Sequence, residues 1–308
     1  MKVGTRGSKL ALAQAEKVCG LLRREGVDAE IVVIKTSGDI HVSEPLHAMK
    51  GGVGAFVREI DDLLLGGEID LAVHSLKDVP TARPEGIVQA AVLKRESACD
   101  VSVTIDGRRL ADLKEGSVIG TSSTRRMAFI HRQYPGLITK NIRGNVDTRL
   151  RKLNDGEYDA IILAEAGLIR LGINANAERL DPYEFVPSAN QGVITIAAKE
   201  KSEAAEIAAR LNDETTYIET RVERLIAAYL DGGCVAPMGA YALLSEEEID
   251  VVAEVLSLDG KVCARIKDRI PVEGYEASVM SLAKLLADRG GRVLVEEAKR
   301  RVNSHDQE

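Results

Sequence analysis

Aromatic side chains are scarce in this sequence of 308 residues: Trp is absent, and Phe, Trp and Tyr together make up 3%. Proteins that hold single-stranded nucleic acid stack its bases on aromatic rings, so this class of function is not expected. A formal net charge of −7 argues against a nucleic-acid surface overall, although it leaves room for a local basic site. The 45% hydrophobic and 29% charged residues are ordinary for a globular protein.

Cysteine residues are few, and long apolar runs are absent. The four cysteines form no CxxC motif and no cluster with histidine, so we expect no zinc or other metal site and no disulfide framework. The first residues, MKVGTRGSKLALAQAEKV, lack the apolar run and cleavage site of a secretory signal. No segment reaches the length of a transmembrane helix. These absences predict a cytoplasmic protein with reduced thiols.

Strands and helices alternate in the first part of the chain. The residue pattern predicts strands at Lys2–Thr5, Glu30–Thr36 and Asp70–His74. It predicts helices at Ser8–Glu25 and Phe56–Leu65, where apolar residues recur at helical spacing. Such alternation favours α/β units built around largely parallel sheets.

Two short segments, which we call sequence marks, each occur twice and in the same order. GEIDLAV from Gly67 matches GEYDAII from Gly156, and VGTRGS from Val3 resembles IGTSS from Ile119. Chance explains either mark alone, whereas both in the same order indicate two similar α/β lobes.

Two irregular segments, Lys94–Asp100 and Val186–Gly192, mark where the chain passes between these lobes. Such a double crossover assigns 1–94 with 193–212 to the first lobe and 98–187 to the second. We expect a ligand in the cleft between two lobes of this kind.

The chain is long enough for a further domain, and 215–308 is predicted to form a small α+β domain. Its helices are expected at Tyr217–Leu230 and Tyr275–Asp288, and its strands at Ile249–Ser257 and Lys261–Ile266.

Six arginines fall at or near the predicted carboxyl ends of strands. In GTSSTRR from Gly120, hydroxyl residues and two arginines occupy a strand-to-helix turn, where backbone N–H groups and the positive helix end attract an anion. A single surface arginine is as often solvated or paired with Glu, but six at one topological position predict a cleft for a polyanion. The six are Arg6, Arg125, Arg126, Arg143, Arg149 and Arg170.

One carboxylate is expected among these cations. In HSLKDVPT from His74, the strand delivers Asp78 to the same cleft, and Pro80 ends any helix before it develops. Taken alone, Asp78 is interpreted as a salt-bridge partner, and a catalytic role depends on the rest of the pattern. His74 is interpreted as a structural residue at a strand end.

Cys234 differs in its setting from the other three cysteines. The segment DGGCVAPMG from Asp231 describes an exposed tight loop, whereas a buried inert cysteine would have apolar neighbours in regular structure. Cys19, Cys99 and Cys263 are interpreted as structural or incidental.

Seven segments together resemble the porphobilinogen deaminase family, and they run in order over nearly the whole chain. They are TRGSKLAL from Thr5, GAFVREID from Gly54, HSLKDVP from His74, GTSSTRR from Gly120, RGNVDTRLRKL from Arg143, GEYDAIILAEAGLIRLG from Gly156 and GGCVAPMG from Gly232. Each segment is weak alone, and seven in order are highly specific. The resemblance implies an α/β fold with two lobes like those of periplasmic binding proteins, a double crossover, and a smaller third domain that carries the cysteine.

The resemblance implies a transferase, hydroxymethylbilane synthase, in tetrapyrrole and haem biosynthesis. Its substrate, porphobilinogen, is an aminomethyl pyrrole with acetate and propionate groups, and loss of ammonia leaves an electrophilic azafulvene that the growing chain attacks. Four such condensations on a dipyrromethane cofactor, joined to Cys234 by a thioether, and release by water give hydroxymethylbilane. The expected protein is a monomer that passes its product to later tetrapyrrole enzymes, without a nucleic-acid or membrane partner.

The resemblance also implies residue roles. Asp78 matches the family's catalytic aspartate, because a carboxylate can stabilise positively charged pyrroles and assist proton transfer. Residues that match cofactor binders are Cys234, Lys77, Asp78, Thr121, Ser122, Ser123, Arg125, Arg126, Arg143, Gly144 and Arg149. Residues that match substrate binders are Arg6, Ser8, Phe56, Ser75, Arg143, Arg149, Arg170 and Gln191. Many members have a lysine where this chain has Val53, and Lys50 is the candidate to cover that region.

A two-lobed anion-binding module without catalysis is the rival interpretation, because such lobes serve both binding proteins and enzymes. A transport protein would carry a signal peptide and a regulator a helix-turn-helix, and neither is evident. A phosphate-binding transferase that uses the turn at Gly120 lacks a P-loop lysine. Neither a transport protein nor a regulator needs a glycine-flanked cysteine in a C-terminal domain, which favours the enzyme.

Overall fold

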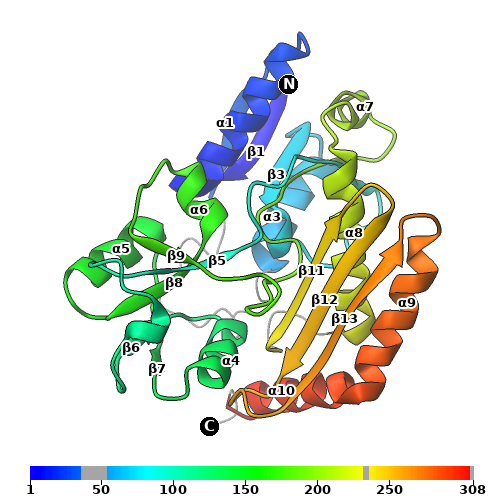
Figure 1. The fold of residues 1–308 in the computed structure, drawn as a ribbon. Coiled ribbons are helices and arrows are strands. Elements are labelled where there is room, and N and C mark those ends of the chain that lie inside the picture. Colours follow the sequence, from blue (N-terminus) through cyan, green and yellow to red (C-terminus); the bar gives the residue numbers. More distant parts are fainter. Residues whose placement is uncertain (36–53, 232–235, 306–308) are drawn as a thin grey trace. The chain divides into compact units, whose positions relative to one another are not determined.

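The computed structural model describes residues 1–35, 54–231 and 236–305, and for 54–56 and 302–305 only the course of the backbone. These residues form three sheets with helices around them (Figure 1). They divide into two units, 1–97 with 192–218 and 98–191 with 219–308. No helix of the described part is long and apolar enough to cross a membrane.

The sheet of the first unit has the strand order β2-β1-β3-β10-β4. Its first three strands are parallel, whereas β10 runs antiparallel to both of its neighbours. The strands are β1 (Lys2–Arg6), β2 (Glu30–Ile34), β3 (Leu71–Ser75), β4 (Ile87–Val92) and β10 (Ile194–Lys199). The helices are α1 (Lys9–Arg24), α3 (Gly54–Leu65), the 3-10 helix η1 (Leu76–Asp78) and α7 (Glu203–Ala209).

Helices α1 and α3 pack on opposite faces of this sheet. Because side chains alternate along a strand, Leu71 and Val73 of β3 join the hydrophobic cluster of α1, while Ala72 joins that of α3. Helix α1 begins after Ser8, whose hydroxyl accepts a hydrogen bond from the backbone N–H of Ala11 at 3.2 Å.

The second lobe repeats this sheet with the order β7-β6-β8-β5-β9. Strands β7, β6 and β8 are parallel, and β5 runs antiparallel to β8 and β9. The strands are β5 (Asp100–Val103), β6 (Val118–Gly120), β7 (Ile138–Lys140), β8 (Ala160–Ala164) and β9 (Ala177–Arg179). The helices are η2 (Leu110–Asp112), α4 (Thr124–Gln133), α5 (Val146–Asn154) and α6 (Glu165–Arg170).

Order and direction therefore match strand by strand: β1 corresponds to β6, β2 to β7, β3 to β8, β10 to β5 and β4 to β9. The repeated sequence marks lie in equivalent places and make the same bonds. The carboxylate of Asp70 accepts a hydrogen bond from the backbone N–H of Lys2 at 2.7 Å, and that of Asp159 accepts one from Val118 at 2.7 Å. The prediction of two similar α/β lobes is confirmed.

Each lobe also has a glycine at a position where a neighbouring side chain comes too close for a Cβ atom. A Cβ atom on Gly4 would lie 2.4 Å from the side chain of Ile69, and one on Gly120 would lie 2.9 Å from that of Tyr158. In each lobe the glycine lies in the central strand of the parallel set, and the bulky residue lies just before the next strand.

The chain crosses from β4 to β5 and returns from β9 to β10, so the antiparallel strand of each sheet follows a crossing. Within the first unit the two crossing segments run side by side, because the backbone N–H of Glu96 donates to the carbonyl of Gly192 at 3.2 Å. The predicted double crossover is confirmed by this topology.

The remainder of the chain adds the antiparallel sheet β11-β12-β13. Its elements are α8 (Glu214–Leu230), β11 (Met238–Leu244), β12 (Glu248–Leu256), β13 (Cys263–Pro271), α9 (Tyr275–Leu286), the π-helical turn η3 (Ala287–Gly291) and α10 (Arg292–His305). The sequence analysis found α8, β12, β13 and α9 but missed β11 and α10.

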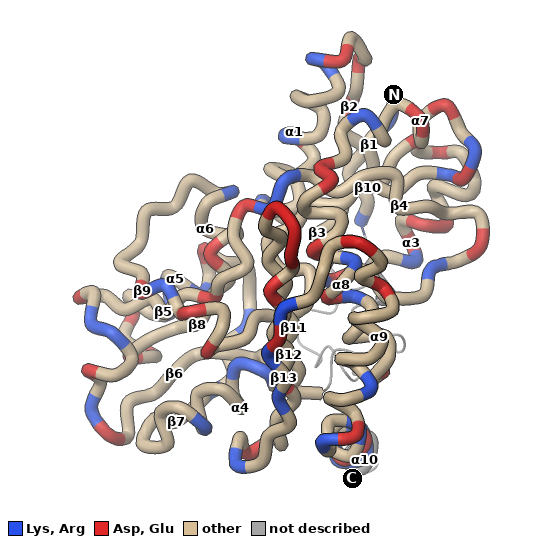
Figure 2. Tube along the Cα trace, turned by 45° about the vertical axis from the view of Figure 1, so that its right-hand side comes forward, with Lys and Arg blue, Asp and Glu red and all other residues tan. Residues whose placement is uncertain are grey.

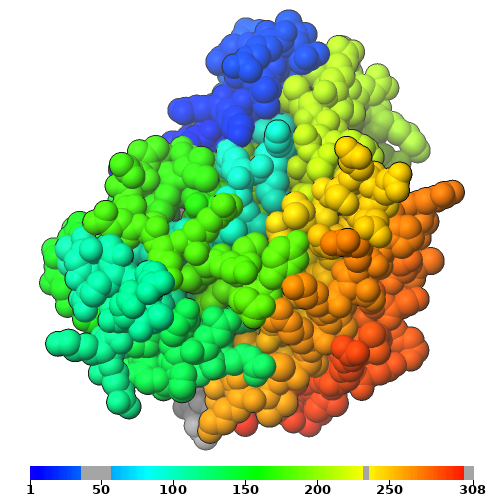
Figure 3. Space-filling model, in the orientation of Figure 1, coloured from blue at the N-terminus to red at the C-terminus, as the bar shows by residue number. Residues whose placement is uncertain are grey.

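This sheet shares a hydrophobic core with the second lobe. Tyr241, Val252 and Leu256 belong to one buried cluster with Phe129 and Phe185. In Figure 3 the orange C-terminal segment adjoins the green second lobe. The predicted division into three domains stays a prediction, since the contacts place these two parts in one unit.

Candidate active site

In the first unit, the predicted site residues follow the carboxyl ends of two adjacent parallel strands. Arg6 is the last residue of β1, and Ser75 is the last residue of β3. The chain then forms the short helix η1, which places Lys77 half-buried and Asp78 exposed at its end. Pro80 follows, and the turn stops there. The strand thus delivers an exposed carboxylate to this edge of the sheet, as expected.

Ser75 is held by a residue that the sequence analysis did not single out. The amide Nε2 of Gln14 donates to Ser75 Oγ at 2.8 Å, and Gln14 is buried within the apolar face of α1. A polar residue in register with buried Val18 and Leu22 was the signal in the sequence. Gln14 therefore fixes the end of β3 against α1.

A second polar group of the first unit lies on the α3 face of the sheet. Asp61 of α3 is buried and forms an ion pair with Arg83. His74 is buried as well, and burial, together with Arg83 and Arg6, lowers the pKa of His74 to about 3. The imidazole is therefore neutral near pH 7, which fits its interpretation as a structural residue.

In the second lobe, the predicted arginines follow three neighbouring parallel strands. Figure 2 marks all Lys and Arg positions in blue. Arg125 and Arg126 lie in the first turn of α4 after β6, while Arg143 and Arg149 flank and enter α5 after β7. Arg170 is the last residue of α6, which follows β8. The carboxyl ends of parallel strands meet at one edge of a sheet, so this edge collects the cationic side chains of the lobe.

The turn between β6 and α4 has the predicted hydroxyl residues. Thr121 is buried, and its Oγ1 accepts a hydrogen bond from the backbone N–H of Ser123 at 3.3 Å. Ser122 Oγ donates to the carbonyl of Ile142 at 2.6 Å, which ties this turn to the one after β7. Ser123 caps α4 by accepting from the N–H of Arg126 at 3.4 Å.

The turn after β7 requires glycine at Gly144. Its φ is 106°, and a Cβ atom there would lie 2.7 Å from the side chain of Thr148. Because Gly144 has no side chain, its backbone lies close to α5, and its carbonyl accepts a hydrogen bond from Arg149 Nε at 2.8 Å. This bond sets the direction of the Arg149 side chain.

Asp100, which the sequence analysis did not assign to the site, holds three of the predicted residues. Its Oδ2 accepts from Arg125 Nη2 at 2.6 Å, and its Oδ1 accepts from Arg126 Nη2 at 2.7 Å and Nε at 3.1 Å. Gln191 Nε2 donates to Oδ1 as well, at 3.0 Å. Burial alone would raise the pKa of Asp100, but Arg125 and Arg126 hold it well below the usual range. The carboxylate is therefore ionised throughout the working pH range.

The two arginines are also bound to backbone carbonyls. Arg125 Nη1 donates to the carbonyl of Val186 at 2.8 Å, and Arg126 Nη1 donates to that of Ile162 at 3.0 Å. The Arg125 guanidinium lies 6.0 Å from the ring centroid of Phe129. Both side chains are built into the lobe, with 4% and 8% of Arg125 and Arg126 exposed.

Arg149 is the cation best placed to receive an outside carboxylate. Among the residues that the structure describes, no carboxylate forms an ion pair with it. Burial, with a contribution from nearby Arg126, lowers the pKa of Arg149 to about 10, which still leaves it charged at pH 7. Two arginines compensated by one carboxylate, beside a third without one, fit a ligand that brings its own carboxylates.

Several predicted residues lie beyond this description. Cys234, Lys50 and Val53 fall outside the described residues, and Phe56 belongs to α3 by its backbone alone. Cys19 and Cys99 are both buried. No group of three metal-binding side chains is found in the described ranges.

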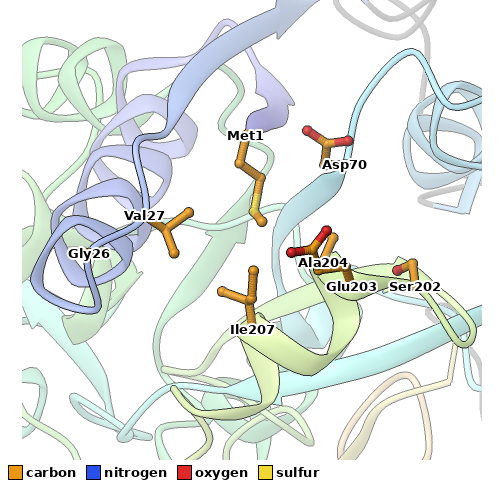
Figure 4. A pocket seen from close by; sticks show the side chains of 8 residues that line it. All are labelled: Met1, Gly26, Val27, Asp70, Ser202, Glu203, Ala204 and Ile207. Carbon is orange, nitrogen blue, oxygen red and sulfur yellow. The ribbon is translucent and has the colours of Figure 1, made fainter.

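A cavity of about 580 Å³ in the first unit lies at the opposite edge of the sheet (Figure 4). Its residues precede β1, β2 and β3 or lie around α7: Met1, Gly26, Val27, Asp70, Ser202, Glu203, Ala204 and Ile207. No predicted site residue lines it, and its carboxylates repel anions. The cavity is therefore separate from the candidate active site.

These features define a two-lobed α/β protein whose strand ends carry one exposed carboxylate in one lobe and a group of arginines in the other. The model of the porphobilinogen deaminase, dipyromethane cofactor binding domain matches residues 1–207, and that of the porphobilinogen deaminase, C-terminal domain matches residues 217–288. The chain belongs to the porphobilinogen deaminase family. It is accordingly a transferase, hydroxymethylbilane synthase, of tetrapyrrole biosynthesis, and its cofactor is dipyrromethane.

Curated relatives agree over nearly the full length. The chain is 65% identical over 303 residues to a probable porphobilinogen deaminase of Methanocella arvoryzae, covering 98% of this chain and 100% of that one. It is 51% identical to one of Methanosarcina mazei (97% and 95%), and 41% identical to the porphobilinogen deaminase of Syntrophobacter fumaroxidans (97% and 98%).

Among solved structures, a periplasmic substrate-binding protein of an ABC transporter from Coxiella burnetii matches with a TM-score of 0.41 and 13% identity. The match covers 68% of this chain and 91% of that one.

Proposed function

We propose that this chain condenses porphobilinogen with Asp78 as the catalytic carboxylate and with the arginines of the second lobe as the binders of cofactor and substrate carboxylates. The observation that carries this proposal is the edge formed by β7, β6 and β8, where Arg149 has no described carboxylate partner. Each pyrrole unit brings an acetate and a propionate, so a lengthening chain needs several guanidinium groups.

Dipyrromethane, when bound, supplies the terminal pyrrole to which substrate units are added. Cys234 is the proposed attachment point, and a thioether at that position withstands the acid–base steps. Arg143 and Arg149 are proposed to hold its carboxylates, and Arg126 lies near Arg149. Ser122 joins the turn after β6 to the turn after β7, and Ser123 caps α4, so both are proposed to shape the backbone of the cofactor site.

Asp78 has the exposure that a catalytic carboxylate needs. A carboxylate beside the pyrrole nitrogens stabilises the positive charge that develops when ammonia leaves, and it accepts or returns a proton. Arg6, Ser75, Lys77 and Arg170 are proposed to hold the incoming substrate. We also propose that the protein is a cytoplasmic monomer that passes its product to later tetrapyrrole enzymes.

Intact mass spectrometry of the purified protein and of Cys234→Ala tests the attachment. The wild type should carry an added mass of two pyrrole units that grows stepwise with porphobilinogen, and Cys234→Ala should carry none. Cys19→Ala, which removes a buried thiol in the other unit, is the matched control and should load fully. A wild type that gains no adduct after incubation with porphobilinogen would contradict the proposal and favour an anion-binding module.

A further inference from the structure

We infer that Asp100 is a positioning residue for the cofactor site: through its two oxygens it sets the directions of the Arg125 and Arg126 guanidinium groups. The inference rests on the proposed function, in which these arginines serve the bound dipyrromethane. It adds a residue of opposite charge that neither the family motifs nor the list of expected binders contains.

The geometry of the contact supports orientation as the role. Asp100 Oδ1 accepts from both Nε and Nη2 of Arg126, so one oxygen fixes the plane of that guanidinium as well as its position. Its other oxygen accepts from Arg125 Nη2, and each arginine donates a further bond to a main-chain carbonyl. A carboxylate that is 0% exposed cannot move to follow its partners, so the partners take up positions around it.

The charge balance leaves the site ready for an anion. Asp100 neutralises one of the two positive charges on Arg125 and Arg126, and the neighbouring Arg149 has no ion pair in the described residues. The cluster of three guanidinium groups therefore keeps a net positive charge after Asp100 is counted. The buried acid allows two arginines to be packed together without cancelling the attraction for a ligand carboxylate.

Comparison of the two lobes separates this role from a requirement of the fold. Asp100 is the first residue of β5 and pairs with the last residue of β8. The equivalent residue in the first lobe is Ile194, which begins β10 and pairs with the last residue of β3. The same sheet is thus built with a buried isoleucine at that position, so the topology does not require a carboxylate there.

The positions of the two arginines also differ between the lobes, as the position of Asp100 does. Arg125 and Arg126 are the second and third residues of α4, and the corresponding residues of α1 are Leu10 and Ala11. An acid with two arginines in one lobe stands where the other lobe has three apolar residues. The lobe that carries the acid is the lobe with the anion-binding edge.

Asp100 also connects the two crossing segments to the edge formed by the carboxyl ends of β7, β6 and β8. Gln191, at the end of the returning segment, donates to Asp100 Oδ1 at 3.0 Å and to the carbonyl of Ala98 at 2.8 Å. Val186, on the same segment, receives a hydrogen bond from Arg125. The carboxylate is therefore the common acceptor of the helix α4 turn and the second crossing.

The test measures cofactor loading by intact mass in Asp100→Asn, with Glu254→Gln as the matched control. Glu254 is a buried carboxylate of the same unit that also pairs with two arginines, Arg132 and Arg265, and its partner on α4 lies in the last turn of that helix, not in the first. Both substitutions remove a buried charge, so both are expected to lower the melting temperature. Asp100→Asn should load the two-pyrrole adduct at least tenfold more slowly than the wild type, and Glu254→Gln at the wild-type rate.

Equal loading rates in Asp100→Asn and the wild type would overturn the inference, and so would equal losses of loading in the two variants. If Asp100→Asn does not fold, Asp100→Ala prepared with and without formate replaces it, because formate supplies a carboxylate in the vacated space. Loading that rises with formate concentration supports the positioning role, and full loading without formate overturns it. Absence of the adduct from the wild-type protein would instead contradict the proposed function. Failure of the inference about Asp100 and failure of the proposed function therefore give different results.

Discussion

The two lobes of this protein share one sheet topology and differ in the charge that they place at the carboxyl ends of their strands. In the first lobe, these ends carry Arg6, Lys77 and the exposed Asp78. In the second, they carry five arginines, with Asp100 buried among two of them. The scaffold bonds, such as those of Asp70 and Asp159, are the same in both. The two lobes thus have the same frame of strands and scaffold bonds, and the turns after the strands carry different functional residues.

The largest expected effect is on the chemical role of the first lobe. Asp78→Ala should lower the turnover rate by about 10²- to 10⁴-fold, the usual contribution of a positioned acid–base group. The melting temperature should stay near the wild-type value, because Asp78 is exposed. Steady-state kinetics together with thermal unfolding measures both. Wild-type turnover in the variant would remove Asp78 from the mechanism.

The binding role of the second lobe is examined with Arg149→Leu. Loss of a charge-assisted contact should reduce the rate of cofactor loading by about 10- to 100-fold. The free energy of unfolding should change by less than about 1 kcal/mol, since removal of a half-buried cation offsets the lost bond to Gly144. Arg151→Leu, an exposed position on the same helix, is the control and should load normally. Normal loading in Arg149→Leu would place the carboxylate site elsewhere.

The stability of the first lobe should respond to acid through His74. Burial, Arg83 and Arg6 lower its pKa to about 3, so the folded state keeps it neutral while the unfolded state is protonated below about pH 6.5. The unfolded state then binds more protons, and the free energy of unfolding falls by about 1.4 kcal/mol for each pH unit below that value.

His74→Gln should remove this dependence between about pH 6.5 and pH 5, a window that lies above the range in which the carboxylates of the unfolded chain take up protons. Urea unfolding at a series of pH values measures it. An equal slope in the variant and the wild type would show that another group is responsible.

The smallest effect concerns the bonds that the lobes have in common. Asp70→Ala and Asp159→Ala each remove an exposed carboxylate that accepts from a backbone N–H at 2.7 Å. Each should cost about 1 kcal/mol of unfolding free energy, and the two losses should be similar. Thermal and denaturant unfolding of the pair measures this. A loss several times larger in one lobe would show that the duplicated frames differ in energy despite their equal geometry.

Sequence patterns predicted the elements whose signals are local. The predicted helix Ser8–Glu25 and the predicted strand Asp70–His74 end within a residue of α1 and β3. Strand β11 was missed because its small and apolar residues, MGAYALL, show neither alternation nor a turn signal. Helix α10 was missed because Gly290, with a φ of 104°, breaks the pattern that continues beyond it.

The candidate site was predictable where side chains follow strand ends, and less so where they act on one another. Asp100 was interpreted as the last residue of an irregular crossing segment, whereas it begins β5 and its role depends on Arg125 and Arg126 folding against it. Gln14 is similarly concealed within the apolar face of α1. Neither contact has a signature in local spacing, because the partners are 25 and 61 residues away.

By itself, the sequence determined the family, the duplicated α/β frame, the catalytic candidate Asp78 and the six arginines at strand ends. Those features follow from local periodicity, turn chemistry and motifs in fixed order. Only the tertiary structure decided which arginines are already compensated and which keep their charge for a ligand. The physical reason is that burial and charge pairing depend on distances between residues far apart in the chain, and folding alone sets those distances.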